Sequence, residues 1–126
     1  MRNNFNLLLL LAFAVLGCTN SNYKQGKALF ESNCATCHMP DGSGVAKLYP
    51  SLLKFDTSRI SVSDMPCLIR YGRDSEQYTL KMEGIRNLRD IEINNIINYI
   101  LNDLNSLEIE FKINDTRKIL KNCKSG

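Results

Sequence analysis

Two cysteines and a histidine stand close together at Cys34, Cys37 and His38, and no other group in the chain has side chains so suited to chemistry. Two thiols separated by two residues can each add to one vinyl group of a haem, and the next residue can place an imidazole under the iron. Thiol–disulfide exchange and zinc binding are the alternatives. A redox dithiol is expected within a βαβ pattern and zinc needs four ligands, and the sequence offers neither. The spacing therefore favours one covalently attached haem with His38 as an iron ligand.

The opposite face of the iron must be filled by Met, Lys or a backbone amine, or be left without a ligand, because His38 is the only histidine. Met39 is joined directly to His38 and cannot reach that face. Met65 and Met82 remain as candidates, since methionine is a common partner of histidine in haem proteins that transfer electrons. We prefer Met82, which lies in a long polar loop just before the last amphipathic segment. Met65 opens a helix and is expected to fill core volume, but it stays open as the alternative ligand.

The N-terminus has the features of a targeting segment. Arg2 precedes an apolar run over residues 7–16, which as a helix would reach only about 15 Å, against about 30 Å of bilayer hydrocarbon. Residues 1–17 are therefore predicted to be a signal peptide. Val15-Leu16-Gly17-Cys18 is typical of a bacterial lipobox, so we expect lipid on Cys18 and a short tether over residues 18–22. A plain signal peptide, with Cys18 merely near the cleavage site, is the alternative.

Two further cysteines, Cys67 and Cys123, are left without a role in the motif or the lipobox. Export places the chain where disulfides persist, so these two cysteines are predicted to pair. Closing a loop of this length contributes about 4 kcal/mol in the chain-entropy model and would tie the C-terminal tail to the domain. Two unconnected thiols are the alternative.

Length and composition indicate one small helical domain. The chain has 126 residues, 44% of them hydrophobic, with no Trp and a formal net charge of +3. Loss of residues 1–17 would lower that charge to +2, because Arg2 is their only charged residue. Such a weak basic balance gives no support to nucleic-acid binding.

Hydrophobic periodicity predicts an all-α fold. Helices are expected over residues 23–33, 64–71, 90–104 and 114–122. The segment 90–104 is the strongest, because its isoleucines and leucines form one continuous stripe. The asparagines of that segment and the next residue are expected to face solvent; they are Asn94, Asn98, Asn102 and Asn105. Residues 73–88 are predicted to be an irregular loop, and no strand is predicted.

These residues together resemble the small single-haem class I cytochromes c, over residues 23–104. The run Gly26-Lys27-Ala28-Leu29-Phe30 before the motif, and Asp41-Gly42-Ser43-Gly44 after it, are similar to that family's first helix and haem turn. Tyr49-Pro50-Ser51-Leu52 resembles a loop whose proline carbonyl accepts a hydrogen bond from the ligand histidine. The resemblance thus implies that Pro50 orients His38. It also implies that Tyr99, in the terminal helix, crosses the first helix at Gly26 and Phe30.

The sequence departs from that family in three places. Glu83 follows Met82 where proline is frequent, Arg89 stands where a Ser or Thr N-cap is usual, and residues 105–126 form an extension beyond the family pattern. The lipobox, the Cys67/Cys123 pair and the wealth of Asn, Ile and Lys resemble cytochrome lipoproteins of Bacteroidetes-type bacteria.

The resemblance implies an electron carrier rather than an enzyme. It would be anchored to the inner or outer membrane on the periplasmic side and would pass single electrons between respiratory complexes or reductases, without binding nucleic acid. Lysines flanking the expected haem edge could steer an acidic partner; they are Lys24, Lys27, Lys47, Lys54 and Lys81. Candidates for holding the haem propionates are Arg59, Arg70 and Tyr78. The alternative function is a haem-based sensor or haem enzyme, which requires a labile sixth ligand.

Overall fold

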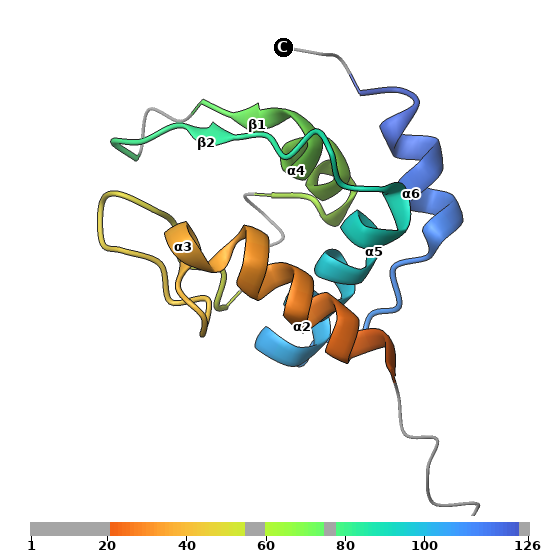
Figure 1. Cartoon of the computed structure of the whole chain (residues 1–126), viewed down its shortest axis with the longest axis horizontal. Helices are drawn as coiled ribbons and strands as arrows, with labels where there is room; N and C mark the ends of the chain where they lie inside the picture. The colour runs from red at the N-terminus through yellow and green to blue at the C-terminus, as the bar shows by residue number, and fades with distance from the viewer. Residues whose placement is uncertain (1–20, 55–59, 75–77, 124–126) are drawn as a thin grey trace, which may run out of the picture.

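The first helix and the cysteine motif form one nearly continuous helical stretch (Figure 1). The computed structural model, which describes residues 21–54, 60–74 and 78–123, begins with helix α2 (Ser21–Asn33), followed after one residue by α3 (Ala35–His38). The Cys34 N–H donates to the Phe30 carbonyl (2.8 Å) and the His38 N–H to the Cys34 carbonyl (2.9 Å). Helical hydrogen bonding therefore continues through the motif and fixes the relative positions of its side chains. α2 starts at Ser21, two residues earlier than expected.

Several predictions fall on residues outside the described ranges. They are the signal peptide (residues 1–17), lipidation of Cys18 and the propionate role of Arg59. Across the residues that are described, no helix combines the length and the apolar character needed to cross a bilayer.

The predicted long helix at 90–104 is present as two connected segments, α5 (Asp90–Asn98) and the π-helical turn η2 (Tyr99–Leu104). Its apolar stripe forms the centre of the core, since Ile93, Ile96, Ile97 and Leu101 are each 0% exposed. The Glu92 side chain, in the first turn of α5, caps the N-terminus of the helix in place of the usual N-cap side chain. Its Oε2 accepts the Arg89 N–H (2.7 Å), and its Oε1 accepts from the Arg89 guanidinium (2.8 Å). A carboxylate in the first turn also interacts favourably with the helix dipole.

The Glu92 contact predicts a specific pH dependence of stability. Hydrogen bonds from the side chain and backbone of Arg89 hold the pKa of Glu92 below its ordinary value. A carboxyl group with a lowered pKa in the folded state stabilises the protein above its unfolded pKa of about 4.3, and this contribution disappears as the pH falls through the folded pKa. We expect Glu92→Gln to flatten the loss of stability below about pH 5, measured by urea unfolding of both proteins at a series of pH values. Parallel curves for the two proteins would contradict this role.

The crossing of α2 and α5 brings the two helix backbones into close contact (Figure 1). A Cβ atom added at Gly26 would overlap the Asn95 carbonyl oxygen and lie 2.8 Å from the Tyr99 Cβ. One turn further on, the rings of Phe30 and Tyr99 pack with centroids 5.3 Å apart at an interplanar angle of 49°. The contact that the resemblance implied for Tyr99 is therefore present, and it anchors the helix that leads into the cysteine motif.

The middle of the chain contains a short helix and a two-stranded ribbon. The 3₁₀ turn η1 (Val62–Asp64) leads into α4 (Met65–Tyr71), which has Pro66 in its first turn and ends at Gly72, where φ is +80°. The chain then enters β1 (Gly72–Arg73), which pairs antiparallel with β2 (Met82–Glu83). The prediction of an irregular loop without strands was wrong here. These strands are two residues long, and a pattern of alternating side chains needs more residues than that to be recognised.

The asparagines of α5 and η2 do not face solvent as expected. Asn98 accepts the Phe111 N–H (2.9 Å) and donates to the Phe111 carbonyl (2.9 Å). Asn102 does the same with Ile109, at 2.8 and 2.9 Å. Each side-chain amide thus pairs with the backbone of the C-terminal segment as a neighbouring strand would. Asn94, only 6% exposed, donates to the Phe111 carbonyl and to the Thr116 hydroxyl.

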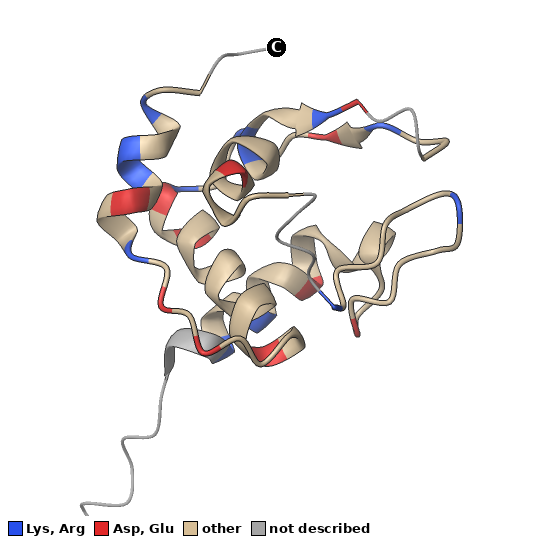
Figure 2. Cartoon of the chain, turned by 180° about the vertical axis from the view of Figure 1, so that it is seen from behind, with Lys and Arg blue, Asp and Glu red and all other residues tan. Residues whose placement is uncertain are grey.

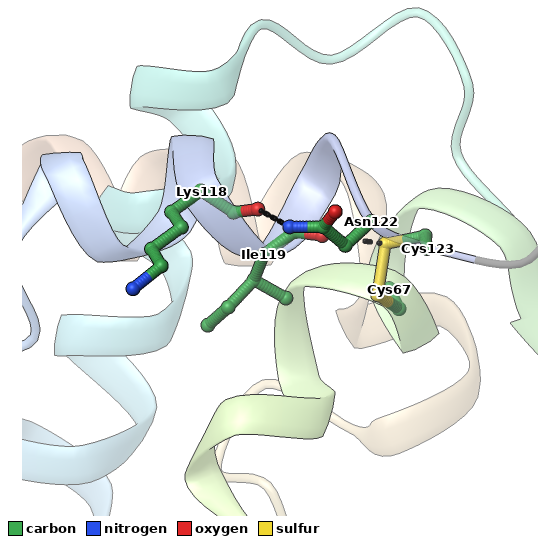
Figure 3. The surroundings of a disulfide bond; sticks show 5 residues. All are labelled: Cys67, Lys118, Ile119, Asn122 and Cys123. Carbon is green, nitrogen blue, oxygen red and sulfur yellow. Dashed lines mark hydrogen bonds between the residues drawn. A yellow bond between two sulfur atoms is a disulfide. The ribbon is translucent and has the colours of Figure 1, made fainter.

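The chain ends in α6 (Ile113–Leu120), which packs against both α4 and α5 (Figure 1). Arg117 and Lys118 in the last turn of α6 and Lys121 just after it are exposed, and Figure 2 shows basic positions at this end of the helix. Just beyond the helix, Cys123 forms a disulfide bond with Cys67 of α4, the pairing expected from the sequence (Figure 3). The described chain is thus largely helical, as the predicted all-α class requires.

Candidate functional site

His38, the last residue of α3, is held in a defined orientation. Its side chain is buried at 7% exposure, and its Nδ1 lies 3.0 Å from the Pro50 carbonyl oxygen. A carbonyl only accepts hydrogen bonds, so Nδ1 carries a proton, and in the neutral imidazole Nε2 keeps its lone pair. This is the arrangement that orients a histidine for metal binding and raises its basicity.

The loop that carries Pro50 folds back onto the motif. The Gly44 N–H donates to the His38 carbonyl (3.0 Å), and the Val45 N–H to the Tyr49 carbonyl (3.0 Å). Gly44 has φ of +70°, and a Cβ at this position would lie 2.7 Å from the Pro50 carbonyl group. Only glycine combines that backbone angle with so close an approach. Gly44 is therefore a positioning residue for the Pro50 carbonyl, a role that the sequence pattern did not reveal.

A cavity of about 540 Å³ opens beside Cys34 and His38. This volume falls within the range of about 300–1000 Å³ that is usual for cofactor pockets. Its walls are mainly apolar, with side chains from the Pro50 loop, α4, α5, η2 and the segments that precede η1 and β2; these include Leu52, Leu53, Ile60, Leu68, Ile69, Leu80, Ile96 and Ile100. The Cys34 thiol and the His38 imidazole on its wall, the Cys37 thiol in the adjoining helix α3 and the apolar walls are groups that a covalently attached haem requires. The residues present fit that cofactor.

Both candidate methionines line the same cavity. Met65 is 5% exposed and belongs to the main hydrophobic cluster, together with Ile69 of the same helix. Met82 is half-buried on β2, at the edge of the domain. The core packing of Met65 agrees with a volume-filling role, whereas Met82 is free of that cluster.

Among the residues that the structure describes, the charged side chains on the cavity wall are those of Lys54 and Arg73, and Tyr78 lines it as well. Arg70, expected near the cofactor, lies elsewhere. Its guanidinium donates to Asp90 Oδ1 (2.9 Å) and to the Arg86 carbonyl (3.0 Å), so it ties α4 to the start of α5. Lys54 lies four residues after Pro50, and Arg73 directly follows Gly72, the residue that ends α4. This closeness to two recognisable sequence signals could have identified both residues as cavity cations.

The environment of the thiols argues against dithiol redox chemistry. Burial, with a smaller contribution from the charge of Cys37, raises the pKa of Cys34 to about 12. A reactive dithiol instead needs a lowered pKa, because the thiolate is the nucleophile. The pKa of Tyr49 is raised as well, mainly by a hydrogen bond with the Cys37 side chain. As for zinc, the described residues contain no group of three or more His, Cys, Asp or Glu side chains that could hold a metal ion.

One backbone contact, called the rim contact below, joins two segments that lead into the cavity-lining residues Pro50 and Met82. The Thr79 N–H, in the segment before Met82, donates to the Lys47 carbonyl (3.1 Å), in the loop before Pro50. Leu48 and Leu80 beside it are 40% and 42% exposed. The histidine side and the Met82 side of the cavity are therefore linked at the rim.

Not all of the five lysines expected to flank the haem edge lie near the cavity. Lys54 lines the cavity, Lys47 lies at the rim contact, and Lys81 precedes Met82 and pairs with Asp74 (3.6 Å). Lys24 and Lys27 stand in the first half of α2, which extends away from the motif (Figure 1). Three of the five therefore belong to the cavity side.

Comparison with known proteins adds two findings. Residues 23–103 match the family model described as cytochrome c. The cytochrome subunit of fructose dehydrogenase from Gluconobacter japonicus is 33% identical to this chain over 86 residues. That similarity covers 60% of this chain and 18% of the subunit, so the chain spans less than a fifth of the relative's length.

Proposed function

Because this chain belongs to the cytochrome c family, we propose that it carries single electrons between redox proteins through one haem attached to Cys34 and Cys37. His38 and Met82 are the proposed axial ligands. The observation that carries this proposal is the His38 imidazole at the wall of an apolar cavity, with its Nδ1 proton directed to Pro50 and Met82 on the same cavity. When bound, the haem supplies a one-electron couple, whose potential a methionine ligand raises.

The protein orients the His38 ligand, excludes water from the cavity and supplies positive charge on the cavity wall. The Pro50 carbonyl keeps the proton on Nδ1 and so keeps Nε2 available. The apolar walls exclude water, which helps to set the potential. Lys54 and Arg73 are the cavity cations that suit the two haem carboxylates.

The docking face is proposed at the cavity mouth. Exposed Leu48, Leu53 and Leu80 supply apolar contact there, and nearby Lys47 and Lys54 favour an acidic partner. Along the rest of the described chain, basic and acidic residues are interspersed (Figure 2). The name of the relative states that it is a cytochrome subunit of a dehydrogenase, so a dehydrogenase is one class of electron donor to test.

The proposed location is the periplasmic side of a membrane, with lipid on Cys18. Because α2 begins at Ser21, only Thr19 and Asn20 separate Cys18 from the domain. Two extended residues span about 7 Å, so the domain would be held close to the membrane surface.

The test is expression of the full chain together with a c-type haem maturation system. Haem staining that survives a denaturing gel is expected, followed by a low-spin spectrum of the reduced protein that carbon monoxide does not change. Absence of covalent haem would reject the proposal. Rapid carbon monoxide binding would instead support the haem-sensor or haem-enzyme alternative, because it shows an open or weakly held sixth position.

The rim contact gives a further prediction about Met82. Thr79→Pro removes the N–H that donates to Lys47, a bond worth about 1 kcal/mol, or roughly fivefold in an equilibrium. We expect carbon monoxide to bind the reduced variant roughly fivefold faster than wild type. Thr79→Ala keeps the N–H and removes only the longer Oγ1 hydrogen bond to the same carbonyl (3.5 Å), so it is the control. Equal rates for Thr79→Pro and Thr79→Ala would show that the rim contact does not restrain Met82.

A further inference from the structure

The segment that follows the cytochrome c match packs against the helices that line the cavity. The match ends at residue 103, and α6 beyond it packs against α4 and α5. The same two helices line the cavity with other side chains, Leu68 and Ile69 from α4 and Ile96 from α5. The C-terminal extension (residues 105–123) therefore supports the cavity from outside.

The extension is fastened at both of its ends. Near its start, the amides of Asn98 and Asn102 each make two hydrogen bonds to its backbone. In α6, Thr116 is 0% exposed and accepts from Asn94. At its end, the disulfide joins Cys123 to Cys67, which lies between the cavity residues Met65 and Leu68 in the sequence of α4 (Figure 3).

Helix α4 in turn holds the segment that carries Met82. The Ile69 carbonyl accepts the Ile85 N–H (2.8 Å), and Arg70 donates to the Arg86 carbonyl (3.0 Å). α4 also runs directly into β1, where Arg73 is the partner of Met82 across the ribbon. A shift of α4 would therefore displace both the ribbon and the backbone that follows Met82.

We propose that the C-terminal extension is a redox-sensitive clamp, in which the Cys67–Cys123 disulfide fixes α4 and so positions Met82 at the cavity. This inference rests on the proposed function, in which Met82 is the sixth ligand. Cys67 and Cys123 are positioning residues, and both are only half-buried. A dithiol reductant in the cell envelope opens the clamp by thiol–disulfide exchange. The Cys67–Cys123 bond then becomes two thiols while the two thiols of the reductant become a disulfide.

The test uses the full-length haem-loaded protein and the double variant Cys67→Ala/Cys123→Ala. We expect carbon monoxide to bind the reduced variant about tenfold faster than wild type, a change equivalent to about 1.4 kcal/mol. Its reduction potential is expected to fall, because the methionine ligand is held less firmly. Asn98→Ala, which loosens the start of the extension, is expected to change both quantities in the same direction. Asn122→Ala removes only a local bond to the Lys118 carbonyl and is the matched control.

A loss of stability alone would leave the carbon monoxide rate and the potential of the folded protein unchanged, and this result would overturn the clamp. Should the double variant not retain haem, wild type treated with a dithiol and then alkylated provides the same two measurements. The proposed function fails in a different way, since wild type itself would then lack covalent haem or bind carbon monoxide rapidly. If wild type is low-spin, and the proteins without the disulfide show the wild-type carbon monoxide rate and reduction potential, the clamp is rejected and the proposed function is not.

Discussion

Met82→Leu is expected to turn a six-coordinate, low-spin haem protein into one that binds carbon monoxide rapidly. Leucine replaces methionine with little change in volume, so the cavity wall remains while the sulfur ligand is lost. The reduction potential is expected to fall on the order of 0.1 V, given that axial ligands set haem potentials over about 0.8 V. Visible spectra of the reduced variant, with and without carbon monoxide, and a redox titration measure both effects.

Met65→Leu is the matched control for that experiment, because Met65 lines the same cavity and is deeply buried. It is expected to keep the wild-type spectrum and potential, and to lose less than about 1.5 kcal/mol of stability. A carbon monoxide complex formed by Met65→Leu and not by Met82→Leu would assign the ligand to Met65 instead.

Gly26→Val is expected to destabilise the protein by about 3 kcal/mol or more, the upper range for an overpacked core. The added Cβ would overlap the Asn95 carbonyl oxygen and force apart the two helices that cross at this point. Urea unfolding of the haem-loaded protein measures the change in the free energy of unfolding. The haem motif follows α2 directly, so weaker haem incorporation is expected as well.

The control for this prediction is Ala28→Val, on the exposed side of the same helix. It carries the lower helix propensity of valine, about 0.5 kcal/mol, without the overlap. Similar losses in the two variants would mean that the close crossing at Gly26 contributes little to stability.

Sequence reasoning was most accurate where local chemistry or a long repeat determines structure. The motif helix and the isoleucine stripe of residues 90–104 depend on spacings of three or four residues, which can be read directly. The contact between His38 and Pro50 was available only through resemblance, because nothing local connects residues so far apart in the sequence. The Cys67–Cys123 bond was reached by assigning the other three cysteines first.

The errors share a physical cause, which is pairing with a partner that the local sequence does not reveal. Asn94, Asn98 and Asn102 recur every four residues, as polar residues on a solvated helix face do. Their partners are backbone groups of a segment up to 17 residues away, so no pattern of side chains indicates the contact. Arg70 was misplaced for the same reason, since its partner Asp90 is 20 residues distant. The choice between Met65 and Met82 also depends on tertiary packing.

The pairing of Asn98 and Asn102 with main-chain atoms has an evolutionary consequence. Every residue other than proline offers the same N–H and C=O groups, so the side chains at positions 109 and 111 can change without loss of these bonds. Substitution of the exposed Ile109 should therefore be tolerated, while the two amides are constrained. Deamidation of either amide would exchange a donor for a carboxylate oxygen facing a carbonyl. We expect such chemical ageing, rather than substitution of Ile109, to be what detaches the extension.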